Sequence, residues 1–267
     1  MGWLKLPAEI DEMGRSRGVV KPDDYLPAYE EQLEHLRSEE FTLLELGVFG
    51  GQSLEMWRDS FPAATIVGVD IGDCDVDLGD RVHFVRGDQR DCDLLADLRR
   101  RFAPESGFEV IIDDASHVAE PTAASLQCLF NDHLAAGGLY VVEDWGTGYM
   151  HGPQWGGRAM KPGTIGADAL GKQGRSLGKG LRYPSHDFGM VGLVKRLFEH
   201  MTVSAWQTEY DRGSEGTEPG VVAVKDEIAK AGRIGELIQE DALEIAKLTA
   251  YPGMVVLEKA RDGALTA

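Results

Sequence analysis

Two pairs of acidic residues follow two apolar runs, about thirty residues apart, in this chain of 267 residues. Asp113 and Asp114 lie in IIDDASH, Glu143 and Asp144 end VVED, and His117 stands three residues after the first pair. Four carboxylates at one rim repel each other unless a cation lies among them. Carboxylates without thiolates favour a hard divalent ion such as Mg2+, Mn2+ or Ca2+. The sequence therefore predicts a metal site, beside which a neutral histidine can take a proton.

A second set of residues that could bind a ligand lies in ELGVFGGQS, residues 45 to 53, where we expect an earlier apolar run to turn into a helix. Gly47 and Gly51 permit a tight turn and a close approach of the backbone to a ligand. Ser53 can help to cap the new helix. Glu45 adds a carboxylate at the end of the run. This spacing differs from the GxGxxG pattern of dinucleotide-binding domains.

Acidic residues also follow the next two apolar runs. Asp70 closes GVD, where a carboxylate can accept hydrogen bonds from ribose hydroxyls. Asp88 in RGDQ can accept a hydrogen bond from an adenine amino group, and Gln89 stands beside it. Polar sites in this order predict a nucleoside pocket at the carboxyl edge of a parallel sheet.

The elements that must position these residues alternate between short apolar runs and amphipathic stretches, which is typical of a parallel sheet with helical crossovers. We expect strands at 41–46, 65–70, 82–86, 108–113 and 138–143, and helices at 24–38, 52–60, 91–103 and 120–135. The predicted fold is α/β, with a doubly wound, mostly parallel Rossmann-like sheet. Its fourth and fifth strands would lie about 4.8 Å apart, so the two acid pairs can converge.

The later part of the chain gives a weaker pattern. Residues 145–189 are rich in glycine, and a loop of that length is typical of a lid or a binding loop. Aromatic and ionisable side chains in it are candidate acceptor contacts: Trp145, Tyr149, Trp155, His186 and Asp187. Beyond it we expect a helix at 189–200, strands near 202–210 and 220–225, a helix at 232–249 and a strand at 253–259.

We expect a single domain over 1–267, with a helical cap (1–40), a core (41–144), the lid loop (145–189) and the remainder of the sheet (190–267). A formal net charge of -18 argues against nucleic acid or an anionic membrane as a partner. Long apolar spans and a signal-peptide pattern are lacking, so we expect a cytoplasmic protein. Cys74, Cys92 and Cys128 are scattered without a CxxC motif, which predicts reduced thiols.

Glu45, Gly47, Gly51, Asp70 and Asp88 resemble the ordered motifs of class I S-adenosylmethionine-dependent methyltransferases. The stretch from about 25 to 144 is similar to the metal-dependent sugar O-methyltransferases of natural-product biosynthesis, of the mycinamicin, macrocin and calicheamicin-rhamnose type. The similarity lies in LLELGVFGGQSLEMWRDSFP, GVDI, RGDQ, IIDDASH and GGLYVVEDW.

This resemblance implies an O-methyltransferase that uses S-adenosylmethionine and Mg2+ or another hard divalent ion. It places the metal acid three residues before a basic residue, which selects Asp114 over Asp113, with Glu143 and Asp144 as further ligands and His117 as the general base. The donor-binding residues would be Glu45, Gly47, Gly51, Ser53, Asp70, Asp88, Gln89 and Asp113, although Asp113 can instead support the metal site or cap a helix.

The implied acceptor is a small-molecule glycosylated substrate, methylated on a sugar hydroxyl, such as that of rhamnose. Two alternatives stay open: a catechol-type O-methyltransferase acting on an aromatic diol, and a non-catalytic nucleoside-binding module. A homo-oligomer is a further expectation, which no sequence pattern decides.

Overall fold

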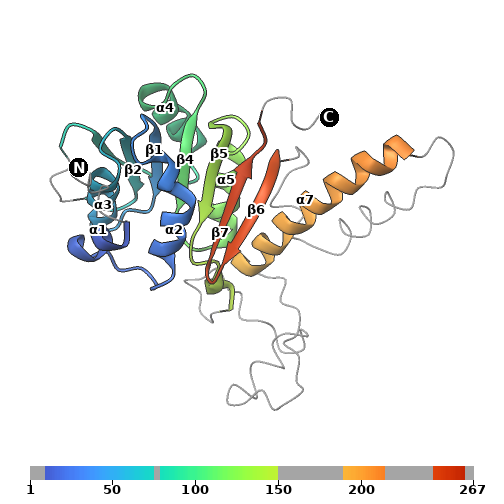
Figure 1. Ribbon diagram of the computed structural model, residues 1–267, viewed down its shortest axis with the longest axis horizontal. Helices are drawn as coiled ribbons and strands as arrows, with labels where there is room; N and C mark the ends of the chain where they lie inside the picture. Colours follow the sequence, from blue (N-terminus) through green and yellow to red (C-terminus); the bar gives the residue numbers. More distant parts are fainter. Residues whose placement is uncertain (1–9, 75–78, 150–188, 214–242, 262–267) are drawn as a thin grey trace, which may run out of the picture. The chain divides into compact units, whose positions relative to one another are not determined.

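A seven-stranded sheet organises the part of the chain that the computed structural model describes, residues 10–74, 79–149, 189–213 and 243–261. The strand order is β3-β2-β1-β4-β5-β7-β6 (Figure 1). The strands are β1 (Thr42–Leu46), β2 (Thr65–Asp70), β3 (Val82–Arg86), β4 (Phe108–Asp113), β5 (Leu134–Val142), β6 (Ile245–Tyr251) and β7 (Met254–Lys259). The first five pair in parallel, whereas β7 pairs antiparallel with β5 and β6. The predicted α/β, mostly parallel sheet is confirmed.

Helices and short 3-10 turns connect these strands. They are α1 (Ile10–Arg17), α2 (Tyr25–Leu33), η1 (Glu34–Leu36), α3 (Gln52–Ser60), α4 (Cys92–Phe102), α5 (Ala119–Leu129), η2 (Trp145–Tyr149) and α7 (Gly189–Gly213). The helix expected at 24–38 is divided between α2 and η1. The helix expected at 120–135 ends earlier, because β5 already begins at Leu134.

Two predictions for the C-terminal part are wrong. A strand was expected near 202–210, but α7 continues through these residues to Gly213. The helix predicted over 232–249 is wrong from Ile245 onward, where β6 begins, and residues 232–242 lie outside the described part of the chain. β6 is followed by a turn at Pro252 and Gly253, whose φ of 78° suits glycine, and the chain returns as β7. The strand predicted at 220–225 lies outside the described residues, as do the candidate acceptor contacts Trp155, His186 and Asp187.

The chain divides into two compact units. The first comprises Met1–Ser116, Ala124–Asp144 and Leu243–Ala267, and contains the whole sheet. The second comprises His117–Ala123 and Trp145–Ala242. Within the second unit η2 packs closely on α7, since a Cβ on Gly148 would lie 2.6 Å from the Val191 nitrogen.

An aromatic and aliphatic core within the first unit fixes the position of α2. The rings of Tyr29 and Trp57 meet edge to face at 5.0 Å, and both side chains are fully buried. The same cluster includes Leu43, Ile112 and Val141 from the strands. Burial of large aromatic side chains dominates the energetics of such a core. The body of Tyr29 is therefore held in the core, and its hydroxyl group can act at the edge of the sheet.

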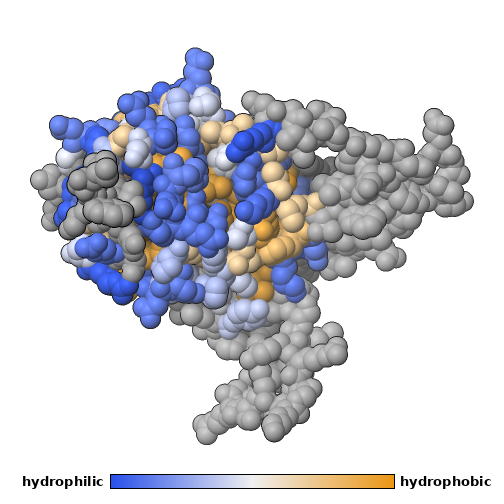
Figure 2. Space-filling model, viewed as in Figure 1, coloured by the Kyte–Doolittle hydropathy of each residue, from blue (hydrophilic) through white to orange (hydrophobic). Residues whose placement is uncertain are grey.

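The surface around α2 is mostly hydrophilic, and apolar residues gather nearer to the β6 edge (Figure 2). On β6 itself, Ala246 and Ala250 are exposed and Leu248 is half-buried. No helix among the described residues is long and apolar enough to cross a bilayer.

A disulfide joins Cys92, the first residue of α4, to Cys128 near the end of α5. Their Cα atoms lie 5.6 Å apart, within the range that a disulfide requires. The prediction of three reduced thiols is therefore wrong for this pair, because two cysteines 36 residues apart in sequence become neighbours when α4 and α5 pack. Cys74 stands outside the disulfide.

Candidate active site

The carboxyl ends of β1, β4 and β5 align in one row. Leu46 pairs with Asp113, and Asp113 pairs with Val142, so the next residue of each strand leaves the sheet at the same edge. The backbone nitrogen of Glu143 donates to the Asp113 carbonyl at 3.0 Å, and that of Asp114 donates to Leu46 at 2.9 Å. The predicted convergence of the two acid pairs is confirmed.

The two acids of each pair differ in exposure. Asp113 and Glu143 are 2% and 1% exposed, whereas Asp114 and Asp144 are only partly buried. Successive side chains of an extended chain point to opposite sides, which divides each pair in this way. One acid of each pair thus belongs to the interior and the other faces the edge of the sheet.

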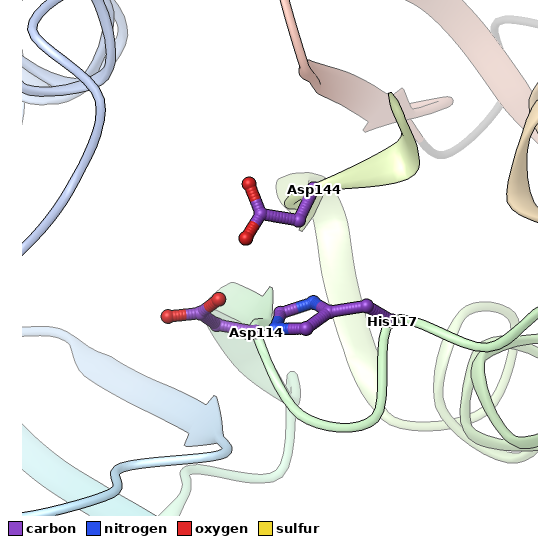
Figure 3. A group of neighbouring side chains, drawn as sticks. All are labelled: Asp114, His117 and Asp144. Carbon is purple, nitrogen blue, oxygen red and sulfur yellow. The ribbon is translucent and has the colours of Figure 1, made fainter. Parts of the chain in front are cut away.

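Asp114 and Asp144 form, with His117, a group of three described residues that could hold a metal ion (Figure 3). Each offers one ligand atom, and these atoms all lie within 4.8 Å of one another. The group contains two of the three predicted metal acids and the predicted base. Glu143, the third predicted ligand, lies deeper.

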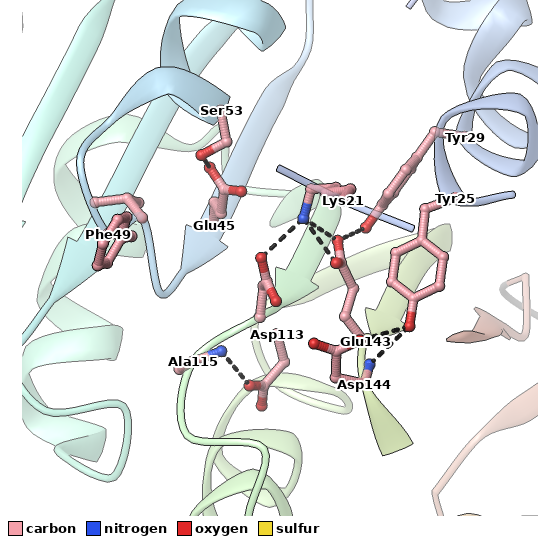
Figure 4. A network of polar contacts seen from close by, with 12 residues as sticks. Lys21, Tyr25, Tyr29, Glu45, Phe49, Ser53, Asp113, Ala115, Glu143 and Asp144 are labelled. Atoms are coloured by element: carbon pink, nitrogen blue, oxygen red, sulfur yellow. Dashed lines mark hydrogen bonds and ion pairs between the residues drawn. The ribbon is translucent and has the colours of Figure 1, made fainter. Parts of the chain in front are cut away.

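Lys21, which the sequence analysis did not single out, lies between Asp114 and Glu143. Its Nζ atom is 2.8 Å from Oδ2 of Asp114 and 2.6 and 2.7 Å from the two carboxylate oxygens of Glu143 (Figure 4). Its side chain is only 4% exposed. A buried ammonium group therefore supplies a positive charge among the carboxylates.

Two tyrosines of α2 also bind the acids after β5. Tyr25 donates its hydroxyl hydrogen to Oδ1 of Asp144 at 2.7 Å, and Tyr29 donates to Oε1 of Glu143 at 2.5 Å (Figure 4). Their spacing of four residues puts both on one face of the helix, a signal that could have suggested paired hydroxyl donors. Lys21 gave no such signal, because its partners lie 93 and 122 residues away.

Burial and charge oppose each other at this rim. Burial raises the pKa of Glu143 to about 7, although the Lys21 ammonium acts against the rise. The pKa of Asp114 is also raised by burial, again opposed by Lys21. Burial alone would lower the pKa of Lys21, but the carboxylates of Glu143 and Asp114 outweigh it and raise that pKa. Lys21 is therefore the main positive charge that opposes the effect of burial on these acids.

The glycine loop after β1 is pressed against the end of β4. A Cβ on Gly47, whose φ is 86°, would lie 2.2 Å from the Asp114 carbonyl oxygen. Gly51 precedes α3 with a φ of 88°. Both glycines are thus required by the backbone, as the sequence predicted. Ser53, expected to help cap α3, makes no cap bond there.

Positive φ angles occur at Phe49, His117 and Asp144 and at no other described residue except glycines. All three residues lie within four residues of the carboxyl ends of β1, β4 and β5. Such a conformation is uncommon for residues with a side chain and tends to cluster at functional sites. The backbone strain therefore marks the same edge of the sheet as the acids do.

Glu45 lies beneath the glycine loop and is completely buried. Ser53 donates its hydroxyl hydrogen to Oε2 of Glu45 at 2.8 Å, while Oε1 has no hydrogen-bond donor among the described residues (Figure 4). Burial raises the pKa of Glu45 to about 8, despite an opposing effect of Lys21. An unpaired buried carboxylate oxygen favours a bound positive group.

Asp70 and Asp88 make local hydrogen bonds. Asp70 accepts from the backbone nitrogens of Val48 and Phe49, both at 2.9 Å, and so ties the glycine loop to β2. Asp88 accepts from three nitrogens of Arg90, which lowers its pKa. Both acids lie at the predicted edge, Asp70 as the last residue of β2 and Asp88 shortly after β3.

Gln89 and Asp113 are bound to one another below the surface. Nε2 of Gln89 lies 3.1 and 3.2 Å from the Asp113 oxygens, which also accept from Ser125 and Tyr140. Oε1 of Gln89 accepts from the Ser116 nitrogen at 3.1 Å. This buried network holds the segment after β4 in place, and through it Asp113 is bound to Ser125 of α5 and to Tyr140 of β5.

The fold that emerges is that of the class I methyltransferases. A solved structure titled "MycE Methyltransferase from the Mycinamycin Biosynthetic Pathway in Complex with Mg and SAH" has a TM-score of 0.63 and 25% identity, covering 95% of this chain and 54% of that one. No family model matches the chain.

Curated relatives confirm the resemblance to sugar O-methyltransferases of antibiotic biosynthesis. Mycinamicin VI 2''-O-methyltransferase of Micromonospora griseorubida is 37% identical, over 51% of this chain and 34% of the relative. Demethylmacrocin O-methyltransferase of Streptomyces fradiae is 37% identical, over 55% and 37%. A rhamnosyl-tetracenomycin-C 3'-O-methyltransferase of Streptomyces olivaceus is 32% identical, over 75% and 46%. The chain thus spans less than half the length of each of these relatives.

Proposed function

We propose that this chain is an S-adenosylmethionine-dependent and divalent-metal-dependent O-methyltransferase that acts on a sugar hydroxyl of a glycosylated natural product. One observation carries the proposal. Asp114 and Asp144 leave the carboxyl ends of the neighbouring strands β4 and β5, beside the glycine loop that follows β1. A metal ion and a nucleoside donor would thus lie next to each other at one edge of the sheet.

The acceptor class is supported by the relatives. Their names include 2'-O- and 3'-O-methyltransferases of rhamnosyl-tetracenomycin-C and a 3-O-methyltransferase of L-olivosyl-oleandolide. These relatives are 32 to 38% identical to this chain over 132 to 208 residues. We therefore prefer a sugar hydroxyl to the aromatic diol of a catechol-type enzyme.

The residues present suit the donor. Glu45 offers a buried carboxylate oxygen that no described residue binds, which suits the ammonium group of the methionine part of the donor. Gly47 and Gly51 leave these two positions without a side chain, so the backbone there can approach the donor closely. We assign recognition of the ribose to Asp70 and recognition of the adenine to Asp88. Ser53 would hold the side chain of Glu45, and Gln89 and Asp113 would hold the backbone around the donor.

The residues present also suit a hard divalent ion. Asp114 and Asp144 provide oxygen ligands, which Mg2+ prefers, and we propose Glu143 as a third carboxylate. A bound ion would supply Lewis-acid stabilisation of the negative charge that develops on the acceptor oxygen.

The chain's own groups then perform positioning and proton transfer. We propose that the imidazole of His117 takes the proton of the acceptor hydroxyl, because neutral histidine is a base near pH 7. The acceptor oxygen forms a bond to the methyl carbon as the bond from that carbon to the donor sulfur breaks, which leaves S-adenosylhomocysteine. Correct alignment of oxygen, carbon and sulfur supplies much of the rate enhancement.

Methyl transfer to a panel of rhamnosylated and olivosylated acceptors tests the proposal, with mass spectrometry of the product as the readout. We expect one added methyl group per acceptor, loss of the activity with a chelator and recovery on adding Mg2+. His117→Ala should lower kcat by about 100-fold or more while donor binding stays intact.

An exposed acid of α4 provides the matched control. Asp97→Asn removes a carboxylate that pairs with Arg100 and Arg101, and should leave turnover unchanged. Methylation that persists in the presence of the chelator would contradict the requirement for a metal ion. Donor binding without transfer to any hydroxyl would instead favour a nucleoside-binding module.

A further inference from the structure

Lys21 lies where a cation was expected among the acids. Its Nζ atom is nearly equidistant from three carboxylate oxygens, 2.8 Å from Asp114 and 2.6 and 2.7 Å from Glu143. Two of the three proposed metal ligands are therefore bound to this ammonium group in the structure. The side chain is 4% exposed, so the contact is an internal ion pair.

The ion pair and a metal ion would compete for Asp114. This residue belongs both to the Lys21 contact and to the group of Asp114, His117 and Asp144 that could hold a metal. Two positive charges on one carboxylate repel each other strongly in a buried environment. A carboxylate also binds Mg2+ at about 2.0–2.1 Å, closer than it approaches an ammonium group.

Lys21 is placed on a segment that can release it. It lies between α1, which ends at Arg17, and α2, which begins at Tyr25, and it belongs to neither helix. The preceding residue, Val20, is 98% exposed. Tyr25 and Tyr29, by contrast, are buried and anchored in α2, so their hydrogen bonds to Asp144 and Glu143 can persist when Lys21 moves.

We propose that Lys21 is a positioning residue that holds Asp114 and Glu143 in place as a stand-in cation until a divalent ion displaces its ammonium group. The proposal rests on the proposed metal-dependent function. Without the ion, Lys21 compensates the charge of the buried acids and keeps their side chains in register. With the ion, Lys21 leaves the two carboxylates and its side chain becomes accessible to solvent.

Acylation of lysine side chains, read by peptide mass spectrometry, tests this exchange on the natural chain. The protein is saturated with S-adenosylhomocysteine and labelled with and without Mg2+, while calorimetry on the same sample measures metal binding. We expect Mg2+ to raise the labelling of Lys21 by about fivefold or more, in the range of typical coupling between two ligands.

Two other lysines serve as matched controls. Lys259 is buried, and its ammonium group donates to the carbonyls of Asn131 and Leu134 away from the acids. Lys247 is exposed on β6. Labelling of both should be the same with and without Mg2+. A rise at Lys259 as large as that at Lys21 would reveal general loosening and would overturn the exchange.

The outcomes separate this inference from the proposed function. Binding of Mg2+ with unchanged labelling of Lys21 would overturn the exchange and leave the metal site standing. A lack of Mg2+ binding would overturn the metal requirement itself, and the exchange with it. Binding accompanied by selective exposure of Lys21 would support both.

Lys21→Met provides a second measurement by the same calorimetric titration. Removal of the competing ammonium should tighten Mg2+ binding by about tenfold. Unchanged or weaker binding in a folded variant would contradict the exchange. If the variant does not fold, the labelling of the natural chain decides alone.

Discussion

The hydroxyl of Tyr25 lies 2.7 Å from Oδ1 of Asp144 and 3.2 Å from the backbone nitrogen of the same residue. A residue at the start of α2 thus holds the second residue after β5, whose φ of 53° is unusual for a residue with a side chain. Partners that orient a metal ligand contribute strongly to metal affinity. The N-terminal segment is therefore part of the site.

Tyr25→Phe removes this hydroxyl and retains the ring that packs in the core. We expect Mg2+ affinity to fall by about tenfold, because the Asp144 carboxylate loses the donor that orients it. Titration calorimetry measures the change. Tyr251→Phe is the control, since Tyr251 accepts a hydrogen bond from Gln32 instead of binding an acid of the site. Equal losses in both variants would rule out the orienting role.

Gly47→Ala should destabilise the fold more than Gly18→Ala does. Both glycines have a positive φ, of 86° and 69°, so each substitution carries a backbone penalty of about 1 kcal/mol. Only the Gly47 variant adds a clash with the Asp114 carbonyl, whereas a Cβ on Gly18 meets nothing within 4 Å. Urea unfolding should show a loss larger by about 2 kcal/mol at Gly47. Similar losses would show that the loop moves away from β4 easily.

The buried acid Glu45 should make stability depend on pH. Its pKa is raised to about 8 in the fold from an ordinary value of 4.5, so the folded state binds the proton more tightly than the unfolded state. The stabilising contribution is thus fully present below a pH of about 4.5 and is lost as the pH rises through about 8.

Comparison with Glu45→Gln isolates this contribution. Between pH of about 5.5 and about 8.5, the unfolding free energy of the natural chain should fall by on the order of 3 kcal/mol more than that of the variant. Denaturant unfolding at both pH values measures it. Parallel pH profiles would mean that Glu45 is ionised throughout this range.

The disulfide between Cys92 and Cys128 predicts a specific pattern of thiol reactivity. Without a reductant, an alkylating reagent should modify Cys74 alone in the denatured chain, and after reduction it should modify all three cysteines. Reduction should also lower the unfolding free energy by about 2–4 kcal/mol. Cys128→Ser should abolish that effect of the reductant, whereas Cys74→Ser should not. Three reactive thiols before reduction would contradict the disulfide.

The sequence alone was sufficient to predict the five parallel strands and the acids at their carboxyl ends. Each of these strands is a short apolar run bounded by polar residues. The carboxyl ends of neighbouring parallel strands lie at the same edge of the sheet, so the acid pairs that begin at Asp113 and Glu143 could be predicted to meet there. The strand predicted at 253–259 is confirmed as β7, but its partner β6 was missed, although Pro252 and Gly253 form a recognisable turn signal. A helical spacing of apolar residues before the turn competed with that signal.

The charge balance of the site could not be predicted from local patterns. Lys21 meets Asp114 and Glu143 only because α2 packs across the sheet, and its sequence neighbours carry no apolar periodicity that leads there. The same holds for Gln89, whose side chain turns inward to Asp113. Contacts between residues far apart in sequence depend on packing, which propensity and spacing do not encode.

Calorimetric titration of Mg2+ into the protein saturated with S-adenosylhomocysteine tests the central claim most directly. The natural chain is compared with Asp114→Asn and with the control Asp97→Asn, whose carboxylate pairs with arginines on α4. We predict binding of one ion per chain in the natural protein and in the control, and loss of that binding in Asp114→Asn. Equal binding in all three proteins would contradict a metal site at the ends of β4 and β5.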